Sequence, residues 1–574
     1  MVNGQCSMKF NKTKYPLRTI IAWLWTHHRG CRIQALVNAV IGLLMVAMGL
    51  FGVDTLRHLT DIATGVREGS ITVMALVLAA VFLAEMILHI ISTWVSAVLG
   101  VRAQNMMQQF FFRRLLKGQW SGIERYHSGD VLNRLFSDVY DIVTLLTEVL
   151  PSTLIVTVQF TASLIYLYIM DDTLAFILII VSPLFLLLSR IYFSRMRRIV
   201  RAIKDSNSAI QAVIQESIVH KMVIKTLERT DTMIDRLESR QSVLRTQIKM
   251  RARFSIFTKT LINIGFTSAY LIGLVWGLFQ LQAGVITVSV LIAFTQLINR
   301  IQRPMLDMAR LLPHFVNSLA SSERLMELEE LPLEEDTEPT PLHGPVGLRF
   351  TDVSFHYRPE NGRSGRTVLQ HFSHDFRPGT STAILGPTGA GKTTLIRLML
   401  SLVSPVEGSA VIYNNEESLP LSPSTRFNFS YIPQGNTLFS GTIRDNLLLG
   451  NPDATEQQLR DALQIAMADF VFQLPEALDT PCSEQGGGLS EGQAQRIAIA
   501  RSLLRPCRVL VLDEATSALD IDTERQLLQN LKAVCTDTTI IFVTHRLAVT
   551  EYTTDTINLD RPLNINENDN ENEN

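Results

Sequence analysis

The stretch GPTGAGKTT at 386–394, followed in order by LSEGQ at 489–493 and RVLVLDEATSALD at 508–520, decides the fold of the second half of this 574-residue chain. The first stretch stands between a strand-like run, STAIL, and a helix-like run, LIRLMLSL. That is the context a phosphate-binding loop requires, because glycines let backbone amides approach phosphate and the helix points its positive end at the anion. The sequence therefore predicts an α/β P-loop NTPase domain.

Together these stretches resemble the nucleotide-binding domain of the ATP-binding cassette (ABC) family. The resemblance is highly specific over 348–547, where LSEGQ matches the family signature except that Glu491 stands where the family usually has Gly. A phosphate loop alone would indicate only some nucleotidase. The signature implies that two such domains hold ATP between them, so the resemblance implies ATP and Mg²⁺ as cofactors and a second half-transporter, identical or related, as partner.

The residue types of the phosphate loop fit this chemistry. Lys392 is placed to neutralise the β- and γ-phosphates, and the Thr393 hydroxyl is placed to ligate Mg²⁺. Asp513, at the end of a buried strand, is the expected second Mg²⁺ partner, and the resemblance implies Gln434 as the third residue of the metal site. With Tyr357 and Gln434, which the resemblance adds, the expected ATP-binding set is Tyr357, Gly386, Pro387, Thr388, Gly389, Ala390, Gly391, Lys392, Thr393, Thr394, Gln434 and Asp513.

The resemblance also implies the groups for hydrolysis. Glu514 matches the carboxylate that orients and polarises the attacking water. His545 matches the switch histidine that contacts the γ-phosphate, and Gln434 matches the glutamine that senses the metal and the water. With Lys392 these are the expected catalytic residues. Tyr357 matches the aromatic residue that stacks on adenine, and by alternation its neighbour Phe355 is expected in the core.

The signature predicts its own local structure. Ser490 followed by Gln493 fits a capping box at the start of a helix, which would turn helix amides and the Ser490 hydroxyl toward an anion. In the family that anion is the γ-phosphate held by the other subunit, so Ser490, Gly492 and Gln493 are expected to act in trans. An acid at position 491 favours the helix dipole by roughly 0.3–1 kcal/mol. It would repel a γ-phosphate charge by about 2 kcal/mol at roughly 8 Å with an effective dielectric of 20, so we expect Glu491 to point away from ATP.

Composition argues against nucleic-acid binding, a disulfide framework and a signal peptide. The net charge of −2 gives no bulk signal for nucleic-acid binding, while 47% of residues are hydrophobic. The cysteines are odd in number and scattered, which indicates reduced thiols rather than a disulfide framework. They are Cys6, Cys31, Cys482, Cys507 and Cys535. Residues 1–33 are basic but precede an apolar run too long for a signal peptide, so no signal peptide is expected.

The first half of the chain has the apolar stretches of a membrane domain. A helix needs roughly 20 apolar residues to cross the hydrocarbon core. We expect six such helices, near 34–53, 71–99, 143–169, 173–193, 256–280 and 285–303. The third and fourth should form a tight hairpin, and the fifth and sixth should turn at Ala283-Gly284.

Charge predicts the orientation of these helices. The connection 195–253 holds fourteen Lys or Arg and the connection 101–140 holds six, whereas the tips 170–172 and 281–284 hold none. The positive-inside rule then places both termini, both long connections and the ATPase domain in the cytosol. Within the connections, 127–139 and 209–229 resemble the first and second intracellular loops of ABC exporters, which carry coupling helices.

Polar residues inside the predicted spans are candidates for the substrate path. Ionisable groups in lipid are expensive and tend to face a cavity or each other. Glu85 and His89 are one turn apart and so share a helix face, and they join Asn263 and Gln296 as candidates. The alternative is that they pair within the bundle in a structural or gating role. Arg300 is near a cytoplasmic end and is expected to snorkel.

Six spans followed by the ATPase domain resemble the arrangement of ABC exporters, so the resemblance implies an exporter-type half-transporter that is similar to multidrug and lipid exporters. Its α-helical membrane domain would span 1–325, with long cytosolic helical extensions. An acidic, Pro-rich linker would follow at 326–346, the nucleotide-binding domain at 347–560 and a disordered polar tail at 561–574. The closing strand and helix of the ATPase domain look shortened or absent, and Glu484 matches an extra loop of exporters less securely.

The expected function is ATP-driven export or flipping of a hydrophobic or amphipathic substrate (lipid, drug or peptide) across the cytoplasmic membrane, by alternating access in a dimer. Two other classes remain as alternatives. One is a soluble ABC protein of translation or DNA repair, which the six spans oppose. The other is an ATP-gated membrane regulator or channel with little pumping, which the intact Glu514 and His545 oppose. The substrate itself stays open.

Overall fold

The structure, a computed structural model, describes residues 15–27, 29–126, 128–335, 337–357, 367–482 and 488–559, without the side chains of 177–194. The predicted tail at 561–574 and Glu484 lie outside the described residues. The chain divides into two compact units. One comprises Met1–Leu115 and His127–Glu330, and the other comprises Leu116–Tyr126 and Leu331–Asn574.

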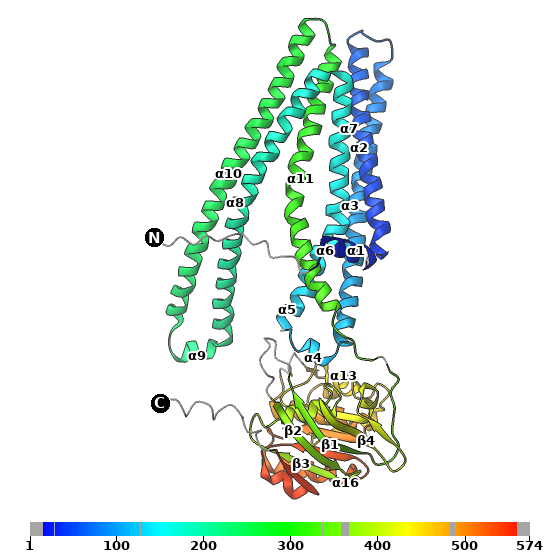
Figure 1. The fold of residues 1–574 in the computed structure, drawn as a ribbon, viewed down its shortest axis with the longest axis vertical. Coiled ribbons are helices and arrows are strands. Elements are labelled where there is room, and N and C mark those ends of the chain that lie inside the picture. Colours follow the sequence, from blue (N-terminus) through cyan, green and yellow to red (C-terminus); the bar gives the residue numbers. More distant parts are fainter. Residues whose placement is uncertain are drawn as a thin grey trace. The chain divides into compact units, whose positions relative to one another are not determined.

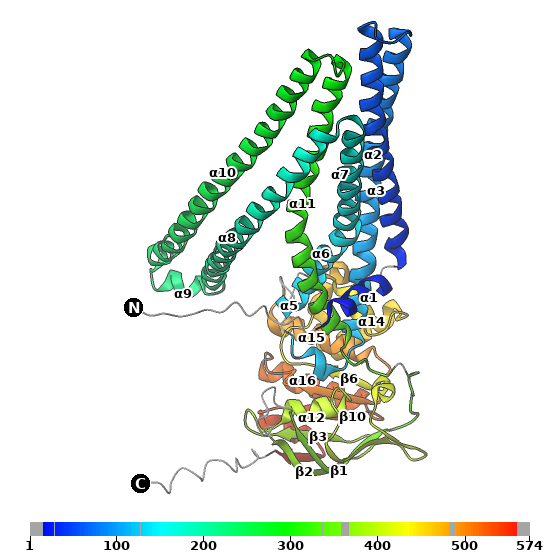
Figure 2. The same ribbon diagram turned by 45° about the horizontal axis from the view of Figure 1, so that its top comes forward.

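The first unit is helical. Its helices are α1 (Leu17–His27), α2 (Arg29–Ala63), α3 (Ile71–Leu116), α5 (Ser128–Asn133), α6 (Val139–Thr144), α7 (Leu150–Met170), α8 (Asp172–Val219), α9 (Lys221–Thr226), α10 (Thr230–Gln282) and α11 (Val288–Glu329). Two π-helical turns, Arg134–Asp138 and Leu145–Val149, join α5, α6 and α7 into one run. In Figures 1 and 2, α8 and α10 lie side by side, joined by α9, and diverge from α2, α3 and α7.

Within the described residues, four helical segments are long and apolar enough to cross a membrane: Ala35–Ala63, Ile71–Leu116, Gly129–Met170 and Asn263–Gln282. They overlap the first, second, third and fifth predicted spans. The predicted spans at 173–193 and 285–303 lie in α8 and at the start of α11. Both predicted turns are present, because α8 begins two residues after α7 ends and Gly284 adopts a positive φ of 71°.

The core of this unit lies along α11. Phe294, Leu297 and Ile298 are fully buried there, and they pack with Val53 of α2 and Leu167 of α7. By contrast, most large apolar side chains of α3 are exposed. Apolar side chains on the outside and a narrow packed seam inside are typical of helices whose solvent is lipid.

The second unit contains two main sheets, which Figure 2 shows together with the helices around them. The antiparallel sheet has the order β2-β1-β4-β5 and the parallel sheet has the order β11-β3-β10-β9-β6. The strands are β1 (Gly347–His356), β2 (Thr367–Phe376), β3 (Ser381–Leu385), β4 (Glu407–Tyr413), β5 (Ser418–Pro420), β6 (Phe429–Ile432), β7 (Gly441–Thr442), β8 (Pro481–Cys482), β9 (Val509–Asp513), β10 (Thr539–Val543) and β11 (Asp555–Asn558). The helices are α4 (Trp120–Ile123), α12 (Lys392–Met399), α13 (Ile443–Leu448), α14 (Glu456–Ile465), α15 (Glu491–Leu503) and α16 (Ile521–Val534).

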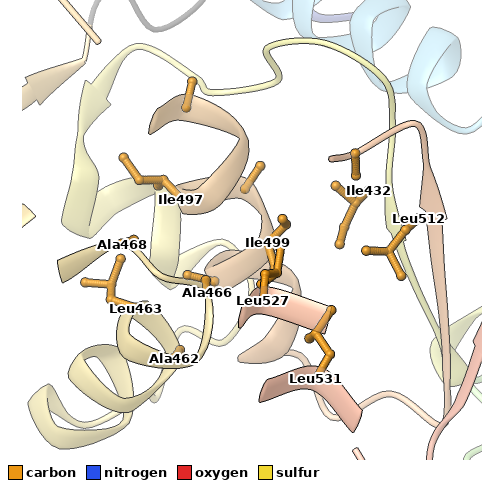
Figure 3. Packing of buried hydrophobic residues seen from close by; sticks show 14 of the residues in the cluster. Ile432, Ala462, Leu463, Ala466, Ala468, Ile497, Ile499, Leu512, Leu527 and Leu531 are labelled. Carbon is orange, nitrogen blue, oxygen red and sulfur yellow. The ribbon is translucent and has the colours of Figure 1, made fainter. Parts of the chain in front are cut away.

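The parallel sheet is covered on both faces, so its central strands are continuous apolar runs, VLVLD in β9 and TIIFV in β10. On one face, Ile432 and Leu512 of the sheet join a cluster with Leu463, Ile497 and Leu527 from α14, α15 and α16 (Figure 3). Because the strands are parallel, their carboxyl ends meet at one edge. That edge carries the phosphate loop after β3 and Asp513 at the end of β9.

Two ends of the second unit differ from the sequence prediction. The closing strand is short but present, because β11 pairs in parallel with β3. The predicted linker at 326–346 is not exposed throughout. Its first residues continue α11 to Glu329, and its far end is packed, with Leu342 and Val346 buried. The few apolar side chains of this segment stand between prolines and acids and show no period, so this packing could not be predicted from the sequence.

Candidate nucleotide site and family

The phosphate loop forms the tight turn that its glycines require. Gly391, with φ of 99°, caps α12, and a Cβ at Gly386 would lie 2.6 Å from the carbonyl oxygen of Leu559. Neither position admits another residue without strain or a backbone shift. Between them, Pro387, Thr388 and Gly389 form the exposed rim, and Ala390 is buried beneath it.

The donors around this loop fit a nucleoside triphosphate and its metal. Lys392 opens α12 and its Nζ donates to the Gly386 carbonyl at 2.6 Å, so the ammonium lies over the loop. Thr393 is exposed beside it, whereas Thr394 is buried. Backbone amides at a helix start, an ammonium, a hydroxyl and the Asp513 carboxylate form the donor set that phosphate oxygens and Mg²⁺ take.

Asp513 lies in a low-dielectric environment at the end of β9. Burial raises the pKa of its carboxyl, the neighbouring Glu514 charge adds to the rise, and a hydrogen bond from the Tyr431 hydroxyl at 3.1 Å opposes it. The pKa of Tyr431 is itself raised, by burial first and by Asp513 second. The Lys392 charge also opposes the rise in the Asp513 pKa, and a bound cation would favour the ionised carboxylate further.

Three predicted catalytic residues come together from separate segments. The Gln434 Nε2 donates to one Glu514 oxygen at 2.8 Å, and His545 Nδ1 lies 3.4 Å from the other. Glu514 has a left-handed backbone with φ of 48°, and its amide donates to the Val543 carbonyl of β10 at 2.8 Å. Such a conformation costs on the order of 1–3 kcal/mol, so the surrounding contacts must hold it in place. The carboxylate is thereby held within hydrogen-bonding reach of both partners.

Tyr357 lies at the other side of α12 and has a partner that the sequence did not predict. Arg397 Nη1 donates to the Tyr357 hydroxyl at 2.7 Å, and that hydroxyl lies 3.3 Å from Thr394 Oγ1. The same guanidinium pairs with Glu124 at 2.7 Å and lies 5.7 Å from the ring centre of Trp120. Phe355 is buried, which confirms its predicted place in the core.

Glu124 and Trp120 belong to the connection Leu116–Tyr126, which the segment between α3 and α5 contributes to the second unit. The predicted first coupling segment, 127–139, is therefore displaced in sequence from the short helix α4 that contacts this unit. The segment 127–139 lies in the first unit, and its coupling role stays a prediction. The helix α4 was not predicted, because a four-residue helix has too few positions to show a period. The second predicted segment, 209–229, contains the short tip helix α9.

The signature folds as its sequence predicts. Ser490 caps α15, its Oγ accepting from the Gln493 amide at 3.2 Å while its own amide donates to Gln493 Oε1 at 2.9 Å. A Cβ at Gly492 would lie 2.8 Å from the Ala518 carbonyl, so glycine there permits close packing against the loop after Glu514. Glu491 is exposed on the first turn.

Comparisons with known proteins place this geometry in a family. The model of the ABC transporter ATP-binding region matches 369–517, and that of the ABC transporter transmembrane region matches 33–305. An ATP-dependent lipid A-core flippase of Bordetella avium is 30% identical over 490 residues, covering 81% of this chain and 78% of the relative. The chain belongs to the ABC transporter family.

This ABC transporter is an exporter-type half-transporter, with a membrane-spanning region and an ATP-binding domain in one chain. An uncharacterized ABC transporter ATP-binding protein of Bacillus subtilis, YfiC, is 27% identical over 548 residues, covering 94% of this chain and 89% of the relative. The solved structure of a bacterial Atm1-family ABC exporter with ATP bound has the same fold, with a TM-score of 0.76 and 20% identity over 93% of this chain and 95% of that one.

The membrane candidates divide into two groups. Glu85 and Gln296 line a cavity of about 600 Å³ among α2, α3, α7 and α11. His89 is exposed on α3, with Thr93 Oγ1 3.4 Å from its ring, and Asn263 is exposed on α10. Neither lines this cavity. Arg300, which was expected to snorkel, lines it instead, with Nη2 4.0 Å from Glu85 Oε1.

Proposed function

We propose that two copies of this half-transporter use ATP binding and hydrolysis to move a hydrophobic or amphipathic substrate across the cytoplasmic membrane. The convergence of Gln434, Glu514 and His545 carries the proposal, because a hydrolytic carboxylate needs partners that hold it in place. The resemblance to a lipid A-core flippase and to a probable multidrug resistance transporter of Bacillus subtilis, 29% identical over 465 residues, supports an amphipathic substrate.

In this proposal each residue of the site has one task. Lys392 neutralises phosphate charge, Thr393 and Asp513 hold the Mg²⁺ that screens the triphosphate, and Tyr357 stacks on adenine. Glu514 orients the attacking water and draws its proton, while Gln434 and His545 fix the carboxylate and the γ-phosphate.

The signature supports a dimer. The amide and the hydroxyl of Ser490 bond to Gln493 within the capping box, and Ser490 is exposed at the start of α15, where the helix dipole favours an anion. We propose that Ser490, Gly492 and Gln493 complete the ATP site of a second chain. The exposed apolar residues Met222 and Val223 on α9 also favour a second chain, because an apolar tip in water is stabilised by a partner.

The charge asymmetry of the sequence supports an orientation with the ATP-binding domain and both termini in the cytosol. Closure of two ATP-binding domains would then move the helical connections that carry α4 and α9, and so switch the membrane helices between inward- and outward-facing states. Hydrolysis at Glu514 would reset the cycle.

The test is movement of a labelled lipid in proteoliposomes that contain the purified full-length protein. We expect ATP with Mg²⁺ to change the leaflet distribution of a fluorescent phospholipid, read by quenching from outside, and Glu514→Gln to abolish that change. Glu416→Gln, an exposed acid on a turn of the antiparallel sheet, is the matched control. ATP-dependent ion conductance with no lipid or hydrophobic-dye movement would overturn the proposal in favour of an ATP-gated channel.

A further inference from the structure

The cavity among α2, α3, α7 and α11 is polar, although it lies within predicted membrane spans. Its volume is about 600 Å³, within the range of roughly 300–1,000 Å³ usual for small-ligand sites. Three of the four helices contribute polar side chains to its wall. These are Glu85, Ser92, Gln159, Gln296, Asn299 and Arg300.

The fourth helix, α2, has glycines that leave room for side chains of the neighbouring helices. A Cβ at Gly49 would lie 2.1 Å from Arg300 Nη1, and a Cβ at Gly42 would lie 2.0 Å from Ile155 Cδ1. The backbone of α2 therefore lies directly against the guanidinium and against α7. Glycine at 49 leaves room for the charged end of Arg300 beside the cavity, in a position that a larger side chain would occupy.

The polar groups of this cavity are poorly satisfied by the protein. The Glu85 and Arg300 charges are 4.0 Å apart, beyond hydrogen-bonding distance. In the part of the chain that the structure describes, the side-chain amides of Gln159 and Gln296 make no hydrogen bond to the protein. Glu85, Gln159 and Arg300 are half-buried and Gln296 is exposed, so their polar ends are open to a ligand. Ionisable groups in membrane helices usually mark a ligand path.

The charges specify the ligand that such a cavity accepts. Arg300 and Glu85 carry opposite charges, so the pair is neutral, and a ligand of net charge would leave one charge uncompensated in a low dielectric. A guanidinium offers a planar set of donors that matches phosphate or carboxylate, and a carboxylate accepts from an ammonium. The amides of Gln159 and Gln296 can bond neutral ester or hydroxyl groups nearby.

We propose that this cavity binds a zwitterionic group, with its phosphate or carboxylate on Arg300 and its ammonium on Glu85. This inference rests on the proposed transport function and names the class of substrate for it. The zwitterion can be the headgroup of a lipid or a free small molecule, because both present the same two charges. The ligand would replace the loose contact between the two side chains with two hydrogen-bonded ion pairs.

The experiment measures binding to the full-length protein in a neutral maltoside detergent, by native mass spectrometry and without ATP. The probes are dioleoyl-phosphatidylethanolamine, which is zwitterionic, and dioleoyl-phosphatidylglycerol, which is anionic. We expect the wild type to bind the zwitterionic lipid about tenfold more tightly than the anionic lipid, because one partly screened charge pair contributes about that much to binding. Glu85→Gln should shift this ratio about tenfold toward the anionic lipid, and Arg300→Gln should weaken both. His89→Gln, one turn along α3 and outside the cavity, should leave the binding of both lipids unchanged.

Equal binding of the two lipids by the wild type would overturn the inference, as would equal effects of Glu85→Gln and His89→Gln. Should the single variants fail to fold, the double exchange of Glu85→Arg with Arg300→Glu keeps the pair, and loss of zwitterion preference in a folded double variant counts against the site. Competition by soluble O-phosphoethanolamine supports a free small molecule, and its failure beside tight lipid binding supports a lipid headgroup. Binding is measured without ATP, so the two proposals can fail separately. If the protein selects the zwitterionic lipid but moves no lipid with ATP, the transport function is refuted and the binding site is not.

Discussion

The nucleotide site and the membrane cavity each place an acid opposite a basic or amide partner, but they hold it differently. Glu514 is fixed by a hydrogen bond of 2.8 Å from Gln434 and by a backbone bond to β10. Among the described residues, the partner of Glu85 is the guanidinium of Arg300, at 4.0 Å. Tight partners suit a site that performs one reaction on one ligand, whereas a loose pair can exchange its partner for a ligand.

The largest effect expected from this comparison is on ATP turnover. Glu514→Gln keeps the size of the side chain and removes the charge that we propose orients and deprotonates water, so steady-state ATP hydrolysis should fall by about 100-fold or more. Binding of a fluorescent ATP analogue should change by less than about threefold, because the phosphate loop is unaltered. Turnover assays beside equilibrium titrations check both.

The matched control is Glu85→Gln in the membrane cavity. It makes the same chemical change at the loosely held acid, and basal ATP hydrolysis should remain within about twofold of the wild type because Glu85 touches no nucleotide. Wild-type turnover in Glu514→Gln would remove the role assigned to that carboxylate. A collapse of basal turnover in Glu85→Gln would erase the distinction between the two sites.

A second prediction uses a pair that is structural. Asp138 is fully buried, and it accepts from Arg324 Nε at 2.7 Å and from Ser321 at 3.1 Å. Asp138→Asn would leave the guanidinium without its carboxylate, and we expect a loss of about 2 kcal/mol in stability, discounted because Arg324 is partly exposed. Thermal unfolding in detergent measures this.

The control for that pair is Asp130→Asn, which removes the half-exposed partner of Arg134 and should cost less than about 1 kcal/mol. Glu85→Gln should also melt close to the wild type, since its contact is loose. If Glu85→Gln melts lower than Asp138→Asn, the cavity pair is the structural one, and the contrast drawn above is reversed.

The difference between the two sites also explains what could be predicted from the sequence. Glu514, Gln434 and the capping of Ser490 follow local patterns of a few residues, so their positions could be predicted without a structure. Arg300 could not be assigned, because only the packing of α11 against α3 shows which acid it faces. The place of Arg300 near the end of a predicted span favoured snorkelling to the membrane surface. Its packing against distant helices instead directs the side chain to the cavity.

Contacts between segments far apart in sequence were missed for the same reason. Arg397 lies within an ordinary helical turn, and no spacing connects it with Glu124 or Trp120, which are over 270 residues earlier in the chain. A sequence pattern such as a strand alternation or a loop motif predicts a single element. The cluster around Arg397 forms only when three separate elements are brought together in space. The residues of the cavity share this property, and only Glu85 and Gln296 among its polar lining were predicted candidates for the substrate path.

A third prediction concerns that cluster. Arg397→Lys retains the charge but loses the fork that joins the Tyr357 hydroxyl to Glu124, a hydrogen bond worth about 0.5–1.5 kcal/mol. If Tyr357 holds adenine, the KM for ATP should rise about two- to tenfold while kcat stays within about twofold. Arg349→Lys, whose guanidinium pairs with Asp375 on the antiparallel sheet, is the control and should leave both constants unchanged. A fall in kcat at constant KM would place Arg397 in the chemistry instead.

The smallest effect is expected at the unusual letter of the signature. Glu491 is exposed at the start of α15, where the helix dipole favours an acid and solvent screens its charge. ATP hydrolysis by Glu491→Gly should therefore stay within about threefold of the wild type, and Glu491→Gln, which keeps the helix propensity, separates charge from backbone effects. A carboxylate close to the γ-phosphate would instead repel it by about 2 kcal/mol at 8 Å, and removing it would raise turnover about tenfold or more at low ionic strength and less at high. That outcome would mean that the tightly organised nucleotide site tolerates an opposing charge, and that its fixed partners offset the repulsion.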